Sequence, residues 1–276
     1  MLFHTIAHKI LSEEASELSL FTVRSYGRGI DKVSRFKPGL LCSEINYDFI
    51  IAYKNAMTAR GNKDATIAKA LSVLKIFVNK IKIRGHISHN PFENVRIKQV
   101  QPRRTFLGLS ELKRFYKNFM ERGIQLKSGE RESIRAFLFS CFTGLRYGDL
   151  KSLTHQEIQD GKIRKEMQKT GDRVYIPLSP QAQTLIPPPK NSLVFKMSDN
   201  SHFNKYLRSG APKLGIKKYL HCHMARHTFA TACITLNIPL TVTSKLLGHR
   251  TLGTTLIYAK YIDRVLDQEM KKFKKW

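Results

Sequence analysis

The sequence predicts a mainly α-helical fold with a small β-sheet, divided into two domains. Apolar residues recur at every third or fourth position through most of the first hundred residues, which is the period of an amphipathic helix. Residues 162–178 alternate between apolar and polar instead, as paired strands do. Between these regions, a basic segment interrupted by proline follows neither period and indicates a domain boundary.

Three predicted helices make up the first domain, which we place at residues 1–100. They span residues 19–36, 43–61 and 64–85, and Asp64 is a suitable N-cap for the third. Each helix carries one apolar stripe, and such stripes are buried when helices pack against one another. We therefore expect a small helical bundle.

The apolar pattern fails across residues 97–104, so we expect a linker at residues 101–106 and a second domain at residues 107–276. A hairpin with its turn at residues 169–172 supplies the small sheet of this domain. Helical patterning appears in three places: from Ser110, a candidate N-cap, across residues 130–142, and from about Phe203.

Basic residues outnumber acidic residues in both domains. The chain has 48 Lys and Arg against 21 Asp and Glu, a formal charge of +27 with neutral histidines. This excess favours a polyanion as the partner. With 42% hydrophobic residues the chain can also form a packed core, which excludes a disordered basic tail.

The sequence shows no sign of membrane insertion or secretion. No apolar stretch approaches the roughly 20 residues needed to span a bilayer. The first residues include His4, His8 and Lys9 and lack a small-residue cleavage site, so we expect no secretory signal. The four cysteines show no Cys-x-x-Cys spacing, which is typical of reduced thiols, and we expect a protein of the cytoplasm.

Four short stretches of the second domain contain residues that can bind phosphate or act as acid, base or nucleophile. They are TGLR at 143–146, KTG at 169–171, HMARH at 223–227, and LGH at 247–249 with Tyr258 nine positions after its histidine. Arg146 follows an apolar helix and a glycine, where a side chain is usually buried. A buried arginine needs an anionic partner, here either Asp149 or the phosphate of a ligand.

His223 and His227 are four positions apart and share one helix face, so a zinc site is one interpretation. The metalloprotease pattern requires Glu directly after the first histidine, where this chain has Met224. No third ligand has a suitable spacing, although Cys222 is adjacent, and we predict no metal. The remaining interpretations are a structural histidine pair and an anion clamp. Arg226 between the histidines favours the clamp, because a guanidinium matches phosphate oxygens.

In order and spacing, the four stretches resemble the catalytic boxes of the tyrosine recombinase (phage integrase) family. TGLRYGDLKSLT resembles the first arginine box, HMARHTFAT the His-x-x-Arg-His box, and LLGHRTLGTTLIY the Leu-Gly-His box with its nucleophilic tyrosine. The resemblance implies two phosphate-binding arginines, a catalytic lysine, two catalytic histidines and a nucleophile: Arg146 and Arg226, Lys169, His223 and His249, and Tyr258.

By the same resemblance, two further residues support the site. His227 matches a position that usually supports it, and Asp149 stands where the family usually has Glu, as a buttress for the first arginine. Lys162 and Lys165 lie in the same hairpin as Lys169 and are alternatives to it.

The resemblance implies a site-specific DNA recombinase that cleaves and rejoins strands through a 3′-phosphotyrosine, without a metal or other cofactor. Such a reaction integrates, excises or inverts DNA, as an integrase or invertase of a mobile element does. Tyr261 lies three residues after Tyr258 and is the alternative nucleophile. Two other functions remain as alternatives: a type IB topoisomerase-like enzyme, which needs no paired sites, and a sequence-specific DNA-binding protein without catalysis.

The expected partners follow from the same family. Residues 1–100 resemble its helical, SAM-like core-binding domain. These helices begin almost at the first residue, so we expect the separate arm-binding domain of many integrases to be missing, in either a simple recombinase or a truncated chain. The two domains would clamp double-stranded DNA, with Arg103 and Arg104 of the linker on its backbone. The resemblance further implies a homotetramer on two DNA sites, accessory DNA-bending proteins as candidate partners, and a place on the bacterial nucleoid. An amphipathic helix predicted after Tyr258 would pack on the neighbouring protomer.

Overall fold

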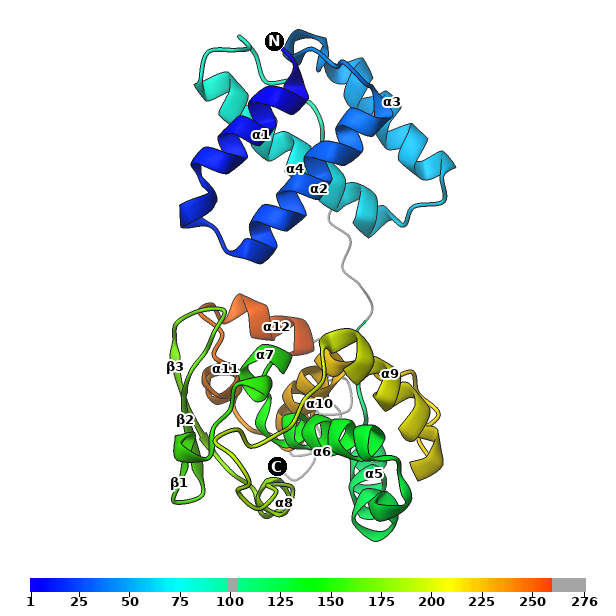
Figure 1. The fold of residues 1–276 in the computed structure, drawn as a ribbon, viewed down its shortest axis with the longest axis vertical. Coiled ribbons are helices and arrows are strands. Elements are labelled where there is room, and N and C mark those ends of the chain that lie inside the picture. Colours follow the sequence, from blue (N-terminus) through cyan, green and yellow to red (C-terminus); the bar gives the residue numbers. More distant parts are fainter. Residues whose placement is uncertain (99–103, 260–276) are drawn as a thin grey trace, which may run out of the picture. The chain divides into compact units, whose positions relative to one another are not determined.

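The computed structural model describes residues 1–98 and 104–259. Over these residues the chain is mainly helical with one small antiparallel sheet, which confirms the predicted fold class. Contacts divide the chain into two compact units, Met1–Arg103 and Arg104–Trp276, both shown in Figure 1. No helix in the described part is both long and apolar enough to cross a membrane.

The first unit is a helical bundle with its own apolar core. Its helices are α1 (Phe3–Glu13), α2 (Leu20–Phe36), α3 (Tyr47–Ala59) and α4 (Asp64–Ile83), with 3-10 turns at Ala15–Glu17 and Cys42–Glu44. Helices α2 to α4 match the three predicted helices, but the N-cap predicted at Asp64 is wrong: Asp64 is the first residue of α4, and Lys63 is its cap residue. Helix α1 escapes the prediction because His4, His8 and Lys9 interrupt its apolar residues, although Phe3 and Ile10 of the same helix are buried.

Helix α3 begins later than predicted. The side chain of Asn46 accepts a hydrogen bond from the Phe49 N–H at 2.9 Å and so caps the helix at that point. The residues before it, Cys42–Glu44, form a 3-10 turn instead of the first turn of the α-helix.

The second unit is built around α6, which packs against α9 and α10. Phe137 and Phe139 of α6 are fully buried, in the helix predicted across residues 130–142. The helices of this unit are α5 (Leu109–Arg122), α6 (Ser128–Thr143), α7 (Tyr147–Lys151), α8 (Pro180–Thr184), α9 (Asn200–Gly210), α10 (Cys222–Thr235), α11 (Leu240–Leu247) and α12 (Gly253–Ala259), with 3-10 turns at Gly123–Gln125, His155–Glu157 and Pro212–Leu214.

The sheet of the second unit has the strand order β1-β2-β3, all antiparallel. Strands β2 (Lys162–Glu166) and β3 (Arg173–Pro177) form the predicted hairpin, in which Ile163 pairs with Ile176 and both are buried. Strand β1 (Ile158–Gln159) is too short to leave a period in the sequence. Lys169 lies in the turn between β2 and β3, as predicted.

The N-cap predicted for α5 is wrong. Helix α5 begins at Leu109, and Gly108 rather than Ser110 is its cap residue. The carboxylate of Glu111 accepts a hydrogen bond from the Gly108 N–H at 2.8 Å, so an acidic side chain inside the first turn replaces a hydroxyl at the cap.

Three predictions concern segments outside the described residues. Arg103 belongs to residues 99–103, and Tyr261 and the amphipathic helix expected after Tyr258 belong to residues 260–276. They stay predictions.

Candidate active site

The end of α6 determines where Arg146 lies. Gly144 has φ +72°, a left-handed conformation that ends the helix. A Cβ at this position would lie 2.6 Å from Cδ1 of Phe229, so the close packing also requires glycine. After the turn Arg146 caps α7, with its side chain only 19% exposed.

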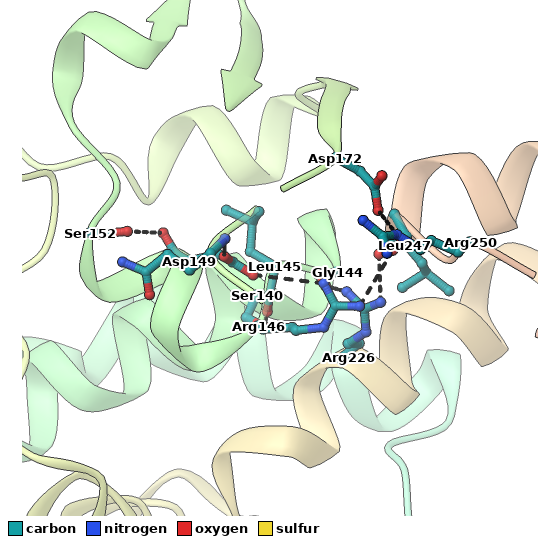
Figure 2. Close-up of polar contacts among 12 residues, drawn as sticks. Ser140, Gly144, Leu145, Arg146, Asp149, Ser152, Asp172, Arg226, Leu247 and Arg250 are labelled. Carbon is teal, nitrogen blue, oxygen red and sulfur yellow. Dashed lines mark hydrogen bonds and ion pairs between the residues drawn. The ribbon is translucent and has the colours of Figure 1, made fainter. Parts of the chain in front are cut away.

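Arg226 reaches the same place from the middle of α10. Its residue is 2% exposed, and its guanidinium donates to the carbonyl oxygens of Gly144 at 2.8 Å and Leu247 at 2.5 Å. Arg146 donates to the carbonyl oxygen of Gly248 at 3.4 Å. The two arginines therefore converge on the carbonyls of consecutive residues where α11 ends. Figure 2 shows both arginines beside Leu247.

Among the described residues, one nitrogen of this arginine pair is buried without a hydrogen-bond partner. It is Nη1 of Arg146, which is buried; the nearest carboxylate oxygen is Oδ2 of Asp149 at 3.9 Å, also without a partner. Buried donors are rarely left unpaired. Together with the second guanidinium, this nitrogen suits a ligand that offers several acceptor oxygens, such as a phosphate.

Asp149 does more than stand beside Arg146. Its Oδ1 accepts a hydrogen bond from the backbone N–H of Gln168 at 2.8 Å, and the residue is 1% exposed. Gln168 directly precedes Lys169. The expected buttress of the first arginine therefore also anchors the hairpin that holds the lysine.

The other side of the hairpin turn is fixed by Arg250, which sequence reasoning did not single out. Its Nε donates to Asp172 at 3.1 Å, and another guanidinium nitrogen donates to the carbonyl oxygen of Thr170. Because Arg250 follows His249 directly, the hairpin is tied to the third predicted box (Figure 2).

The structure distinguishes the three lysines of the hairpin. Lys165 is 7% exposed and pairs with Glu157 at 2.9 Å, and Lys162 lies 5.8 Å from the ring centre of Tyr175. Lys169 is exposed in the turn, with no hydrogen bond or ion pair to another described residue. Lys169 is therefore the one of the three that is free to reach a ligand.

The predicted histidines surround the arginines and are neutral at pH 7. His249 is half-buried, with Nδ1 at 2.7 Å from the hydroxyl of Thr255, and His223 is exposed near the start of α10. Desolvation, followed by the charge of Arg226, lowers the pKa of each to about 4. Burial and the neighbouring Arg146 also lower the pKa of Arg226 to about 9, which leaves that arginine charged at pH 7.

Tyr258 of α12 is buried, at 2% exposure, in a small apolar cluster that includes Phe229 and Leu247. Its hydroxyl lies 2.8 Å from Nδ1 of His227, whose pKa burial lowers to about 3. Burial raises the pKa of the Tyr258 phenol, while the charges of Arg104 and then Arg226 oppose that rise.

Within residues 1–98 and 104–259, no cluster of three metal-ligating groups lies at this site. Among the described residues, the group of histidine, cysteine or acidic side chains with ligand atoms within 4.8 Å of one another is His4, His8 and Asp31, in the first unit. His223 and His227 instead stack edge to face, with ring centres 4.5 Å apart.

The first unit carries a basic hollow that the sequence did not single out. Helices α2 and α4 line it with exposed basic residues around one exposed aromatic ring: Arg24, Arg28, Lys32 and Lys69 around Phe21. No described acidic side chain forms an ion pair with any of the four. Positive charge grouped in this way suits the phosphates of a nucleic acid.

Two converging arginines, an exposed lysine in the hairpin turn and a buried tyrosine suit a class of protein that works on phosphate esters with its own side chains. Comparison with known proteins gives the family. Residues 106–264 match the phage integrase family and residues 2–98 match the phage integrase SAM-like domain. The chain therefore belongs to the phage integrase family, and is a tyrosine-type site-specific recombinase that breaks and rejoins DNA.

Individual relatives agree with this assignment. A tyrosine recombinase of Thermosipho africanus is 28% identical over 233 residues, which cover 79% of this chain and 80% of the relative. The fold is similar to that of a lambda integrase (75–356) dimer bound to a COC′ core site. The TM-score is 0.78 at 21% identity, and the match covers 94% of this chain and 95% of the integrase chain. It is also similar to that of a lambda integrase tetramer bound to a Holliday junction. Here the TM-score is 0.76 at 20% identity, and the match covers 94% of this chain and 77% of the integrase chain.

Proposed function

We propose that Tyr258 is the nucleophile of this recombinase and that Arg146 and Arg226 hold the phosphate it attacks. The phenol oxygen bonds to phosphorus, the bond to the 5′ oxygen breaks, and a 3′-phosphotyrosine remains until the strand is rejoined. The observation that carries the proposal is the unpartnered, buried Nη1 of Arg146 beside a second buried guanidinium. The arginines stabilise the charge that grows on the phosphoryl oxygens.

Lys169 is the proposed general acid, which protonates the departing 5′ oxygen. Its free position in the β2-β3 turn supports this role, and the contacts of Lys162 and Lys165 argue against the alternatives. His223 and His249 complete the phosphate site, and His227 orients the hydroxyl of Tyr258. The residues supply the positive charge themselves, so we propose that the cleavage reaction uses no metal or other cofactor.

The two units divide the work in this proposal. Residues 1–100 form the core-binding domain, residues 101–106 the linker, and residues 107–276 the catalytic domain. The basic hollow on α2 and α4 and the linker residues Arg103 and Arg104 contact the backbone of double-stranded DNA. Affinity should therefore fall steeply as salt concentration rises.

Assembly and cellular setting form the last part of the proposal. A homotetramer on two DNA sites is supported by the tetrameric lambda integrase complex of similar fold. The reaction would integrate, excise or invert DNA in the bacterial cytoplasm, with accessory DNA-bending proteins as candidate partners. Native electrophoresis with one full site and with paired full sites tests the assembly. We expect two protomers on one full site and four on two paired sites. If paired sites give no complex larger than two protomers, the tetramer is contradicted.

Trapping a covalent intermediate tests the reaction. DNA from both ends of the element that carries the gene is nicked near the crossover, so that a short fragment diffuses away after cleavage. We expect a protein-DNA adduct that survives denaturation with the native chain, and none with Tyr258→Phe, which should still bind the DNA. Binding without any adduct from the native chain would favour the non-catalytic alternative.

A further inference from the structure

We infer that Arg104 is a positioning residue for Tyr258: its guanidinium holds the phenol ring, and its charge favours loss of the phenol proton. The inference rests on the proposed function of Tyr258. It gives Arg104 a second role, separate from the expected contact with the DNA backbone.

The geometry places Arg104 against the nucleophile. The central carbon of its guanidinium lies 5.6 Å from the centre of the Tyr258 ring, a cation-π distance. Arg104 is half-buried, whereas Tyr258 is 2% exposed. The tyrosine is thus held at two points, by Arg104 on the ring and by His227 on the hydroxyl.

The residues that follow Arg104 are fixed to the body of the second unit. The backbone N–H of Leu107 donates to the hydroxyl of Thr228 on α10 at 3.0 Å, and Leu107 is 2% exposed. Lys218 donates to the carbonyl oxygen of Phe106 at 3.0 Å. Arg104 therefore directly precedes a segment that hydrogen bonds hold in place, and these bonds support its position over Tyr258.

The charge of Arg104 matters because the phenol must ionise in order to attack. Burial raises the pKa of Tyr258, and the charge of Arg104 is the largest influence that lowers it, ahead of Arg226 and Arg146. Arg226 and Arg146 turn toward the phosphate in the proposed reaction. Arg104 remains the cation dedicated to the tyrosine.

The test compares Arg104→Ala and Arg104→Lys with Arg122→Ala, which removes one positive charge from an exposed position at the end of α5. The substrate is the nicked duplex with a 5′-bridging sulfur, which leaves without protonation. Its single-turnover pH profile therefore reports ionisation of the nucleophile rather than of the lysine. Salt-dependent binding is measured in parallel.

We expect the pH midpoint of cleavage to rise in Arg104→Ala, to stay near the native value in Arg104→Lys and to be unchanged in Arg122→Ala. Each unit of rise corresponds to about tenfold slower cleavage below the midpoint. An unchanged midpoint in Arg104→Ala overturns the inference. If the midpoint is unchanged and the slope of log affinity against log salt concentration becomes shallower by about 0.9, Arg104 is a phosphate contact only. If the native chain forms no adduct, the proposed function fails instead.

A second, independent inference concerns the first unit. We propose that His4, His8 and Asp31 bind a divalent transition-metal ion such as zinc. Nε2 of His4 and Nε2 of His8 lie 3.5 and 2.9 Å from the same carboxylate oxygen of Asp31. The histidines are one turn apart on α1 and the aspartate is on α2, so two imidazoles and a carboxylate converge from two helices. A bound ion would join the start of α1 to α2.

Zinc titration by calorimetry tests this site in the full chain. We expect His8→Gln and Asp31→Asn each to bind one zinc ion fewer than the native protein, and zinc to raise the melting temperature of the native protein more than that of either variant. His89→Gln, an exposed histidine outside the cluster, is the control and should bind as the native chain does. Equal zinc stoichiometry in the native chain and both variants would overturn the proposal.

Discussion

The carboxylate of Asp149 accepts a hydrogen bond at 2.8 Å from the backbone N–H of Gln168, the residue before Lys169. The other oxygen of the same carboxylate lies 3.9 Å from Arg146. One buried side chain therefore sets the distance between an arginine that follows α6 and a lysine in the β2-β3 turn.

This relationship predicts different outcomes for two substitutions of Asp149. Asp149→Asn keeps an oxygen that can accept from Gln168, whereas Asp149→Ala removes it and releases the turn. We expect the alanine variant to lose more cleavage activity and about 1–3 kcal/mol of stability. Urea denaturation and single-turnover cleavage measure both quantities, and equal loss in the two variants would contradict the anchoring role.

Substitution of the two arginines by lysine should separate catalysis from folding. Arg146→Lys and Arg226→Lys should each slow cleavage about 100-fold or more, because an ammonium cannot contact two phosphoryl oxygens in a fork. Only Arg226→Lys should also destabilise the fold, by about 1.5–3 kcal/mol, since Arg226 donates to two buried carbonyls. The control is Arg164→Lys, at an exposed position of β2. Normal cleavage by both active-site variants would remove these arginines from the site.

A substrate with a 5′-bridging sulfur should distinguish the hairpin lysines. This leaving group needs no proton, so it should restore cleavage by Lys169→Ala but not by Arg146→Lys. Lys165→Ala breaks the ion pair with Glu157 and should lose stability, without rescue by the sulfur substrate. Rescue of the Lys165 variant, and none of the Lys169 variant, would assign the general acid to Lys165.

Three histidines of the candidate site predict a stability that falls with acidification. The pKa values of His227, His223 and His249 are lowered to about 3, 4 and 4 from 6.5, so the unfolded chain binds more protons than the native chain between these values. Their contribution is complete above pH 6.5 and is lost as the pH falls toward 4. Buried His227 contributes a slope of at most about 1.4 kcal/mol per pH unit, and exposed His223 contributes less.

Urea denaturation across this window measures the slope for the native chain and for His227→Gln. In the variant, the free energy of unfolding should depend less steeply on pH, by an amount equal to the uptake of up to one proton. The difference is best measured in the upper part of the window, where carboxylates do not yet titrate. An identical slope in both proteins would mean that His227 is not held neutral by the fold.

The sequence was sufficient where a local pattern decides the structure. Apolar spacing predicts α2 to α4 and α6, and alternation predicts the β2-β3 hairpin, because each element buries one face. The six proposed catalytic residues were found through motifs whose spacing is local. The contacts among them were not predictable, because Asp149 with Gln168, Arg250 with Asp172 and Arg104 with Tyr258 join separate elements. The N-cap predicted at Ser110 was wrong, because α5 begins at Leu109 and its cap residue is Gly108, whose N–H donates to the carboxylate of Glu111.

The identity of the tyrosine that becomes linked to DNA tests the central claim most directly. The trapped adduct is digested with nuclease and protease, and the peptide that retains a nucleotide is sequenced by mass spectrometry. The account predicts a nucleotide attached through its 3′ phosphate to Tyr258 and no adduct with Tyr258→Phe. A nucleotide on Tyr261, or an adduct that persists in the phenylalanine variant, would contradict it.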